Sequence, residues 1–336
     1  MTVPTWLFEL LGIDDAPEGA TIQRAGRPVA VDGDVVRFGS AISSAQEQTA
    51  DTFGFKWAKR DTFESPEFRA RTHSWLIERY GDVAGADWWD AYGDQPLVLD
   101  AGCGAGAAAL ELFGERLDRV RYVGADISRA VDVAAARFAE NEVAGGFVQA
   151  DVLDLPFERG AFDVILSEGV LHHTDSTERA FHAVADKLAL GGRFLFYVYR
   201  LKGPIREFTD DYIRERLQAM NPPQAWDALM PLTKLGRALG ELGVEVEVPD
   251  DVGLLDIPAG KIDIQRLFYW HVFKAYHQPS YSLDELNHIN FDWYAPRNAH
   301  RQSVEDVRGW CDAAGLEIER ENVQEAGITV IARRSN

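Results

Sequence analysis

The sequence predicts an α/β protein with a doubly wound, mostly parallel, seven-stranded sheet that ends in an antiparallel hairpin. Three observations lead to this fold class. Short apolar strands alternate with helices across residues 96–199, which is typical of βαβ units in a parallel sheet. A glycine-rich stretch follows the first of these strands. Near the C-terminus, two strand-like segments, 316–323 and 327–334, are separated by a short turn and should pair antiparallel.

The same pattern divides the chain into four regions. They are an N-terminal cap (1–95), the strand–helix core (96–199), a largely helical insertion (200–300), and the last helix and hairpin of the core (301–336). The insertion is rich in Pro, Tyr, Trp and His and interrupts the strand–helix alternation. Because long insertions in compact domains are usually functional, we expect it to bind substrate or act as a lid.

Local signals define the individual elements. Asp32-Gly33 predicts a hairpin turn, and Ser65 followed by Pro66 predicts the start of a helix over 65–81. Ser303 with Asp306 predicts a capped helix over 303–315. We further expect strands over 96–100, 119–127, 146–151, 162–169 and 193–200, and helices over 104–117, 128–142, 176–192 (closed by Gly191-Gly192) and 206–220.

Composition limits the classes of partner. The 336 residues include 34 basic and 54 acidic side chains, which gives a net charge of −20 and a pI near 4.8. Such a chain repels nucleic acids and anionic membranes, so we expect neither as a partner. With only two cysteines, Cys103 and Cys311, a disulfide framework is excluded. No segment is typical of a signal peptide or a membrane span, so the expected location is the cytoplasm.

A glycine loop, VLDAGCGAG (98–106), lies where the first core strand should turn into a helix. Gly102, Gly104 and Gly106 permit a tight turn and close approach of a ligand to the backbone. The following helix start offers free N–H groups, which suit a carboxylate or a pyrophosphate. The loop also satisfies the dinucleotide pattern G-x-G-x-x-G/A, so a nicotinamide-dependent oxidoreductase stays an alternative.

Three acids at predicted strand ends narrow the choice. Asp126 could accept hydrogen bonds from both ribose hydroxyls, whether the ligand is a nicotinamide dinucleotide or another nucleoside. Asp100 could contact an ammonium group, and Asp151 could contact an adenine amino group. A nicotinamide fingerprint requires neither Asp100 nor Asp151. A ligand that combines an amino acid tail, a ribose and an adenine would use all three.

At this point the sequence resembles the class I S-adenosylmethionine-dependent methyltransferases, in particular bacterial enzymes that act on small molecules. The resemblance covers residues 96–199 and rests on five segments in order: LDAGCGAG, GADIS, QADVLDLPF, FDVILSEGVLHHTDS and LALGGRFLFYVY. The C-terminal hairpin also resembles the closing hairpin of that family. The region around RPVAVDGDVVRF resembles a zinc-ribbon-like cap, but it has no cysteines, so we expect no metal.

The resemblance implies a Rossmann-like core that binds S-adenosylmethionine. By matching position, the implied cofactor-binding residues are Asp100, Gly102, Cys103, Gly104, Asp126, Ile127, Asp151, Val152, Ser167 and Glu168.

Candidate catalytic residues follow the fourth core strand. Methyl transfer mainly needs orientation of the reactants, and it needs a base only where the acceptor must lose a proton. His172 and His173 are the candidate bases, and Tyr199 at the end of the fifth strand is the third candidate. The alternative for each histidine is a hydrogen-bonded loop residue.

The insertion gathers positive charge within a strongly acidic chain. Lys202 and Lys274 accompany several basic and aromatic residues, which leads to the hypothesis of an anionic acceptor. The alternative is that the aromatics form the core of the insertion and the arginines pair with acids. The candidate acceptor-binding residues are Tyr197, Arg200, Arg206, His271, Tyr294, Arg297 and His300.

The expected function is therefore methyl transfer from S-adenosylmethionine to a small anionic metabolite of a natural-product or sugar pathway. A second reading keeps the cofactor but transfers its aminocarboxypropyl group or closes a ring. An NAD(P)-dependent oxidoreductase and a non-catalytic binding module are further alternatives. Exposed aromatics in the cap or insertion could form a homodimer interface.

Overall fold

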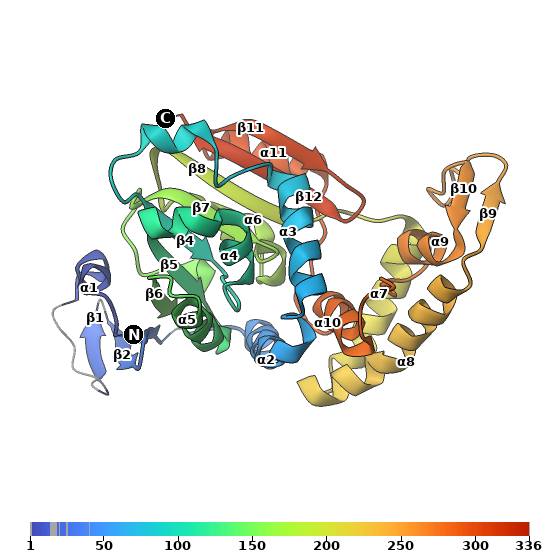
Figure 1. Ribbon diagram of the computed structural model, residues 1–336, viewed down its shortest axis with the longest axis horizontal. Helices are drawn as coiled ribbons and strands as arrows, with labels where there is room; N and C mark the ends of the chain where they lie inside the picture. The colour runs from blue at the N-terminus through green and yellow to red at the C-terminus, as the bar shows by residue number, and fades with distance from the viewer. Residues whose placement is uncertain (1, 14–18, 20, 25, 40, 336) are drawn as a thin grey trace.

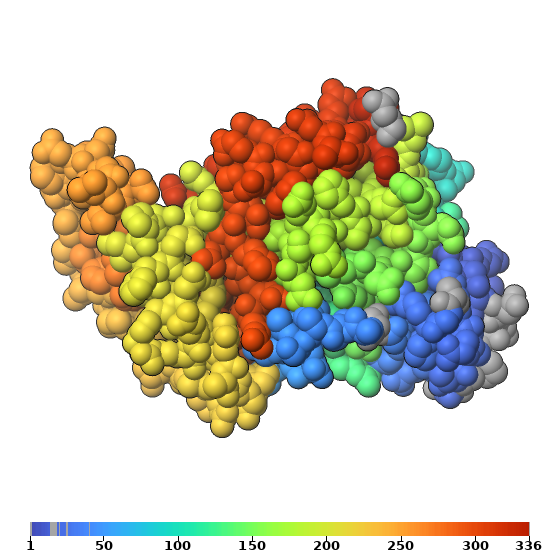
Figure 2. Space-filling model, turned by 180° about the vertical axis from the view of Figure 1, so that it is seen from behind, coloured from blue at the N-terminus to red at the C-terminus, as the bar shows by residue number. Residues whose placement is uncertain are grey.

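The computed structural model describes residues 2–13, 19, 21–24, 26–39 and 41–335. A central sheet lies between two outlying parts (Figure 1). The N-terminal strands extend one edge of it, and the insertion projects to the opposite side of the view from the segment that follows residue 199. Figure 2 shows the same arrangement from behind, with the C-terminal segment lying across the core.

Ten strands of the described chain form one sheet, in the order β1-β2-β3-β6-β5-β4-β7-β8-β12-β11. The strands from β3 to β8 are parallel, whereas β1-β2-β3 and β8-β12-β11 are antiparallel runs. Their bounds are β1 (Thr21–Arg24), β2 (Arg27–Asp32), β3 (Val35–Phe38), β4 (Leu97–Ala101), β5 (Arg121–Asp126), β6 (Gly146–Gln149), β7 (Phe162–Glu168), β8 (Leu188–Tyr199), β11 (Leu316–Val323) and β12 (Gly327–Arg334).

This topology confirms the predicted fold class and corrects the strand count. The seven predicted strands are β4–β8, β11 and β12. The sheet is larger because the predicted N-terminal hairpin joins it: β3 pairs in parallel with β6, with Val36 opposite Val148. Both valines are fully buried, so apolar burial holds the cap strands in the plane of the sheet.

Helices cover both faces of the sheet. One apolar layer includes Phe181 of α6 and Trp310 of α11, and the other includes Leu76, Leu112 and Phe138 of α3, α4 and α5. The bounds are α1 (Thr5–Leu11), α2 (Ser44–Ala58), α3 (Pro66–Tyr80), α4 (Ala107–Phe113), α5 (Ala130–Glu140), α6 (Thr177–Ala185) and α11 (Val304–Ala313), with 3₁₀ turns at Arg60–Thr62, Asp87–Ala91, Gly114–Arg119, Val152–Asp154 and Leu171–His173.

The predicted helix over 176–192 is wrong in its second half. Helix α6 ends at Ala185, and β8 already begins at Leu188, which is fully buried and pairs with Phe162. Gly191 and Gly192 do not close a helix. They lie inside β8, where the register with β7 shifts, and a Cβ on Gly192 would lie 2.7 Å from the Asp163 carbonyl oxygen.

Two other helices begin later than expected. The segment 104–117 is α4 followed by a 3₁₀ turn, because the glycine loop extends to Gly106. In 128–142, Arg129 precedes the first helical residue, while the Ser128 hydroxyl accepts a hydrogen bond from the Ala130 N–H. By contrast, the side chains of Ser65 and Ser303 cap α3 and α11 as predicted.

The insertion forms a separate helical layer with a small hairpin. It contains α7 (Pro204–Leu217), α8 (Pro222–Glu241), β9 (Glu245–Val248), β10 (Gly260–Asp263), α9 (Ile264–His271) and α10 (Leu283–Tyr294). An aromatic cluster that includes Trp226, Phe291 and Trp293 packs against Tyr197 and Tyr199 of β8. The insertion is thus anchored on the end of β8. No helix in the described part of the chain is long and apolar enough to span a membrane.

Candidate functional site

The glycine loop connects β4 to α4 and is held against β5. The N–H groups of Gly102 and Cys103 both donate to the Ala125 carbonyl, at 2.7 and 3.0 Å. Gly102 and Gly104 have φ values of +87° and +52°, which favour glycine. A Cβ on Gly102 would lie 2.2 Å from Val170, and one on Gly104 would lie 2.8 Å from the Trp57 indole nitrogen. A side chain at either position would therefore collide with these residues and fill the space beside the loop.

The three predicted acids lie at one edge of the sheet. Asp100 lies in β4, just before the glycine loop, and accepts a hydrogen bond from the Tyr122 hydroxyl at 2.9 Å. Asp126 accepts from the Gly104 N–H at 2.9 Å and from the Ser128 hydroxyl at 2.6 Å. Asp151 follows β6 and accepts from the Leu153 N–H at 3.0 Å. The parallel strands β4, β5 and β6 bring their carboxyl ends together, as the sequence predicts.

Burial shifts the titration of these acids. It raises the pKa of Asp100 to about 7, although the Tyr122 hydrogen bond opposes the shift. Burial also raises the pKa of Asp126 and of Asp151, against the hydrogen bonds that each accepts. The Cys103 thiol is buried, and its pKa is raised well above the ordinary value. Cys103 is therefore a neutral lining residue and not a thiolate.

A cavity of about 430 Å³ opens at the far end of this edge. Ile127 and Asp151 line its core side, and Phe38 and Ile42 line the side contributed by the N-terminal strands and the segment before α2. Val152, the residue after Asp151, is buried. The cavity could hold a flat group against Ile127, with its polar edge toward Asp151.

Two adjacent histidines follow β7 in the 3₁₀ turn Leu171–His173. Nδ1 of His173 lies 2.7 Å from the Asn298 carbonyl oxygen, so it must carry a proton and donate it. Its Nε2 then carries the lone pair. Nδ1 of His172 accepts from the Tyr199 N–H at 3.3 Å, so its Nε2 carries the proton. Both Nε2 atoms are buried without a partner among the described residues.

Burial keeps both rings neutral. It lowers the pKa of His173 to about 4, although Asp292 and the Asn298 hydrogen bond raise it in part. Burial and the neighbouring His173 hold the pKa of His172 well below the ordinary value. At neutral pH, His173 therefore presents a proton acceptor and His172 a proton donor.

Tyr199 belongs to a buried polar group that joins three elements. Its hydroxyl donates to Asp292 of α10 at 2.7 Å, and the Lys56 ammonium of α2 donates to the same carboxylate. Burial alone would raise the pKa of Asp292, but Lys56, His173 and Lys274 hold it well below the usual range. Burial and Asp292 raise the pKa of Tyr199 well above its ordinary value. Tyr199 is thus a protonated donor and is not a base.

Helix α2 reaches across the whole site. Trp57 lies over Gly104 of the glycine loop. One turn earlier, the Phe53 ring lies 4.9 Å from the His173 ring, centroid to centroid. Lys56 lies between them in the chain and pairs with Asp292. One helix therefore contacts the loop, the histidines and the insertion.

Ser167 and Glu168 end β7 in different environments. The Ser167 hydroxyl donates to the Ala101 carbonyl at 2.9 Å. Glu168 accepts hydrogen bonds from the Arg79 guanidinium and the Tyr80 hydroxyl of α3. Arg79 is fully buried between Trp75 and Tyr197, with its guanidinium carbon 3.4 and 3.5 Å from their ring centroids. Tyr197 therefore packs against Arg79.

The other candidates from the insertion separate into two groups. Arg206 and Tyr294 meet at Asp210, to which they donate at 2.7 and 2.6 Å. Arg206 is buried in this ion pair, which matches the structural alternative for its role. The remaining candidates lie apart: Arg200 forms a backbone bridge with Gln302, His271 is half-buried at the end of α9, Arg297 is exposed, and His300 donates to the Thr174 carbonyl.

Sequence reasoning missed four residues that shape the site: Lys56, Arg79, Asp292 and Asn298. Lys56 stands in a segment dense in aromatic and basic residues, which is a usable signal. The other three are brought in by packing across long sequence separations, and nothing local marks them. In the described part of the chain, no three His, Cys, Asp or Glu side chains come together as metal ligands would.

Part of the core is similar to known methyltransferases. Residues 99–196 match the family model described as a methyltransferase domain. The tRNA (carboxymethyluridine(34)-5-O)-methyltransferase of Xenopus tropicalis is 33% identical over 38% of this chain and 19% of its own length. Ajmaline N-methyltransferase of Rauvolfia serpentina is 29% identical over 44% of this chain and 52% of its own. The chain thus spans less than two thirds of these curated relatives.

A solved structure is also similar in part. Magnesium protoporphyrin IX methyltransferase from Synechocystis, determined with bound S-adenosylmethionine, aligns with a TM-score of 0.44 at 14% identity, over 88% of this chain and 100% of the other. The matched domain contains β4 to β8 up to residue 196, and with them the glycine loop and the three acids. Residues 99–196 are thus similar to a methyltransferase domain, and this match and the curated relatives support a class I S-adenosylmethionine-dependent methyltransferase whose cofactor is S-adenosylmethionine.

Proposed function

We propose that the protein transfers the methyl group of S-adenosylmethionine to a small anionic acceptor, with His173 taking the acceptor's proton. The observation that carries this proposal is the free Nε2 lone pair of His173, which lies three residues beyond the contact between Val170 and Gly102. In this proposal, His173 is the proton acceptor and the glycine loop holds the cofactor.

The residues at the sheet edge fit the cofactor. Bound S-adenosylmethionine supplies an electrophilic methyl group on a positively charged sulfur. In this proposal, Asp100 holds the ammonium group of the cofactor and Asp126 its ribose. Ile127, Asp151 and Val152 contact the adenine in the 430 Å³ cavity. Gly102 and Gly104 leave room for the methionine end, and Ser167 and Glu168 face it from β7.

Several chain residues prepare His173 for proton transfer. The Asn298 carbonyl fixes the Nδ1–H tautomer, and the Asn298 amide in turn donates to Asp175 at 3.0 Å. Phe53 of α2 packs against the ring. His173 is only 3% exposed, so water competes weakly for its lone pair. A positioned base typically contributes about 10²- to 10⁴-fold in rate when its pKa lies near the working pH. Burial lowers the pKa of His173 to about 4, and the nearby Asp292 carboxylate opposes this shift by stabilising the charge that forms on the ring.

The net charge of the chain supports a small acceptor. The relatives are named for different substrates: one for a carboxymethyluridine of tRNA and another for ajmaline. This chain has a net charge of −20, which opposes binding of a polyanion over a broad surface. In the proposal, residues 200–300 hold the acceptor and residues 1–95 cover the cofactor. The cytoplasmic location and the homodimer expected from the sequence remain proposals.

The first experiment is calorimetric titration with S-adenosylmethionine, S-adenosylhomocysteine and NADH. We expect the first two to bind and NADH not to bind. Binding of NADH alone would overturn the cofactor reading in favour of an oxidoreductase.

The second experiment identifies the transferred carbon. The protein is incubated with methyl-¹³C S-adenosylmethionine and pooled small anionic metabolites, and the products are weighed by mass spectrometry. We expect S-adenosylhomocysteine and a labelled small molecule. Methylthioadenosine in its place would show transfer of the aminocarboxypropyl group or ring closure. Label in added tRNA, with none in metabolites, would contradict a small acceptor.

A further inference from the structure

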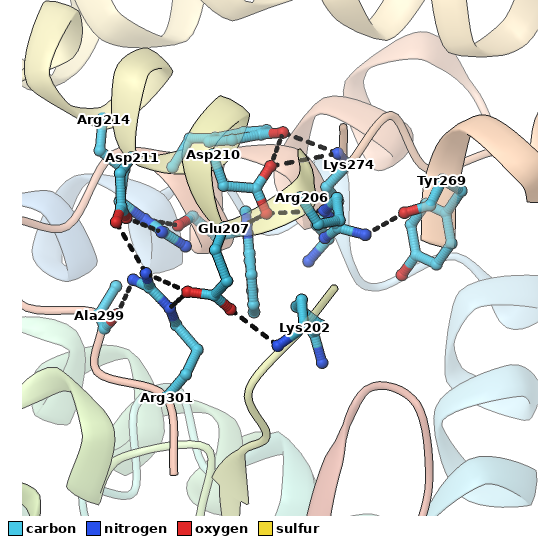
Figure 3. Close-up of polar contacts among 12 residues, drawn as sticks. Lys202, Arg206, Glu207, Asp210, Asp211, Arg214, Tyr269, Lys274, Ala299 and Arg301 are labelled. Carbon is cyan, nitrogen blue, oxygen red and sulfur yellow. Dashed lines mark hydrogen bonds and ion pairs between the residues drawn. The ribbon is translucent and has the colours of Figure 1, made fainter. Parts of the chain in front are cut away.

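Three cations of the insertion gather around one tryptophan. Lys202, Arg206 and Lys274, here called the insertion cation cluster, lie around the ring of Trp293. Figure 3 shows these three cations and their polar contacts. Their charged groups are 5.6, 5.4 and 5.0 Å from the ring centroid. Lys202 and Arg206 lie four residues apart, just before and within α7, and the fold brings Lys274 to them from the segment after α9.

The nearest carboxylate is already saturated. Asp210 accepts from Arg206 Nε at 2.7 Å, from the Trp293 indole N–H at 2.8 Å and from the Tyr294 hydroxyl at 2.6 Å. The backbone N–H of Lys274 also points at it, at 3.4 Å (Figure 3). These donors occupy both oxygens of Asp210, so the carboxylate has no free position for the Lys274 ammonium.

Lys274 is the cation that this arrangement leaves without a partner. Its side chain is 8% exposed, and none of the described residues accepts a hydrogen bond from its ammonium group. The next carboxylate, Asp292, is engaged by Lys56 and Tyr199. An unpaired buried ammonium is strongly unfavourable, so its retention in the centre of the insertion indicates a ligand.

Lys202 and Arg206 have backbone carbonyls as partners, and Arg206 also pairs with Asp210. Lys202 donates to the Ala326 carbonyl at 2.8 Å and to the Glu325 carbonyl. Arg206 donates to the Tyr269 carbonyl in addition to Asp210. Burial and the neighbouring cations hold the pKa of Lys202 well below its ordinary value, so Lys202 carries its full charge only when a ligand favours the charged form. With all three cations protonated, three positive charges would face one buried carboxylate, which is an excess of two. Glu207 pairs with Arg301, and Glu325 is exposed and offsets the charge of Lys202 only in part.

We propose that the insertion cation cluster binds a phosphoryl group of the acceptor. A phosphate monoester carries a charge close to −2 at neutral pH, which matches the excess of the fully protonated cluster, whereas one carboxylate would leave one buried cation uncompensated. This inference rests on the proposed function and names its substrate class. The location agrees, because Trp293 also packs on Tyr199, with ring centroids 4.4 Å apart, and Tyr199 stacks on His172. The acceptor would extend from His173 to the cluster.

The cluster also predicts a proton change on binding. Burial lowers the pKa of Lys274 to about 7. Among the facing groups, Asp292 and Asp210 raise it, and Arg206 and Lys56 lower it. A phosphoryl group would favour the charged ammonium and raise this pKa. Binding at pH 7.5 should therefore take up protons from the buffer.

The test is calorimetry on the full chain saturated with S-adenosylhomocysteine. Inorganic phosphate and pyrophosphate are the probes, acetate is the monoanionic comparison, and two buffers of different ionisation enthalpy report proton uptake. We expect phosphate or pyrophosphate to bind with proton uptake and acetate to bind more weakly. The variant Lys274→Met should weaken phosphate binding by about tenfold or more. The matched control is Lys261→Met, which removes an exposed lysine from β10 and should change nothing.

Each outcome has a defined meaning. Unchanged phosphate affinity in Lys274→Met, or no phosphate binding by the wild-type protein, would overturn the proposal. Stronger binding of acetate than of phosphate would point to a carboxylate acceptor and also overturn it. If Lys274→Met fails to bind S-adenosylhomocysteine, Lys202→Met replaces it, since Lys202 is only partly buried. Binding of S-adenosylhomocysteine tests the methyltransferase proposal separately, so the two failures are distinguishable.

Discussion

His172 and His173 are adjacent, with ring centroids 4.3 Å apart, yet their free nitrogens have opposite roles. Nδ1 of His172 accepts from the Tyr199 N–H, whereas Nδ1 of His173 donates to the Asn298 carbonyl. One free Nε2 is therefore a donor and the other an acceptor. Because only the Nε2 of His173 can accept a proton, a His172 variant serves as the control for the same change at His173.

Replacing His173 should reduce turnover. We expect His173→Gln to lower kcat by about 10²- to 10⁴-fold, because the amide cannot accept a proton from the acceptor. The affinity for S-adenosylmethionine should not change. His172→Gln is the control, and its effect on kcat should be much smaller. Steady-state kinetics with saturating cofactor measures both. Equal losses in the two variants would argue against His173 as the base.

Cofactor affinity should depend on pH through Asp100. The free protein holds the pKa of this carboxyl at about 7, so the ionised form, which attracts the cofactor's ammonium group, becomes dominant only above that pH. Titrations from pH 6 to pH 8 should therefore show a falling Kd for S-adenosylmethionine. Asp100→Asn should bind weakly and without this slope. A pH-independent Kd in the wild-type protein would mean that Asp100 does not contact the ammonium group.

Alanine at Gly104 should damage the cofactor site. The backbone there has a positive φ, and the added Cβ would collide with Trp57. A left-handed conformation alone costs a non-glycine residue about 1–2 kcal/mol. We expect Gly104→Ala to lose calorimetric binding of S-adenosylhomocysteine.

Gly309→Ala provides the matched control. Gly309 lies inside α11, and a Cβ there would meet nothing within 4 Å. That variant should bind normally and gain about 0.5–1 kcal/mol in the free energy of unfolding. Normal binding by Gly104→Ala would show that Trp57 moves away without cost.

The Arg206–Asp210 pair should contribute strongly to folding. Both side chains are about 1% exposed, and removing one partner of such a pair typically costs about 3–5 kcal/mol because the other charge stays buried. Chemical denaturation should show a loss of this size for Asp210→Asn. The exposed pair of Arg308 and Glu321 offers a comparison, and Glu321→Gln should cause a far smaller loss. Similar losses in both variants would contradict the expected role of burial.

Local signals predicted the elements they control. The strands 316–323 and 327–334 and the capped helices after Ser65 and Ser303 are found where expected. The segment LALGG was misassigned because an apolar run fits a helix and a buried strand equally well. Its pairing with β7 decides the outcome, and that contact is not local.

Within the candidate site, too, some residues could be predicted from the sequence pattern and others depend on distant contacts. Asp100, Asp126 and Asp151 could be placed together because the carboxyl ends of parallel strands meet at one edge. Asp292 could not, because its partner Lys56 is 236 residues away in the sequence. The carbonyl of Asn298, which sets the tautomer of His173, is a backbone group and carries no signal in the sequence.

The two ends of the insertion lie side by side. The Leu201 N–H donates to the Gln302 carbonyl at 3.0 Å, and the Gln302 N–H donates to the Tyr199 carbonyl at 2.8 Å. The chain thus leaves β8 and returns toward α11 at nearly the same point. A segment of different length or sequence could join these positions without displacing either element. If residues 200–300 hold the acceptor, as we propose, its recognition is an exchangeable module, and new substrates can be acquired while the strands of the core stay unchanged.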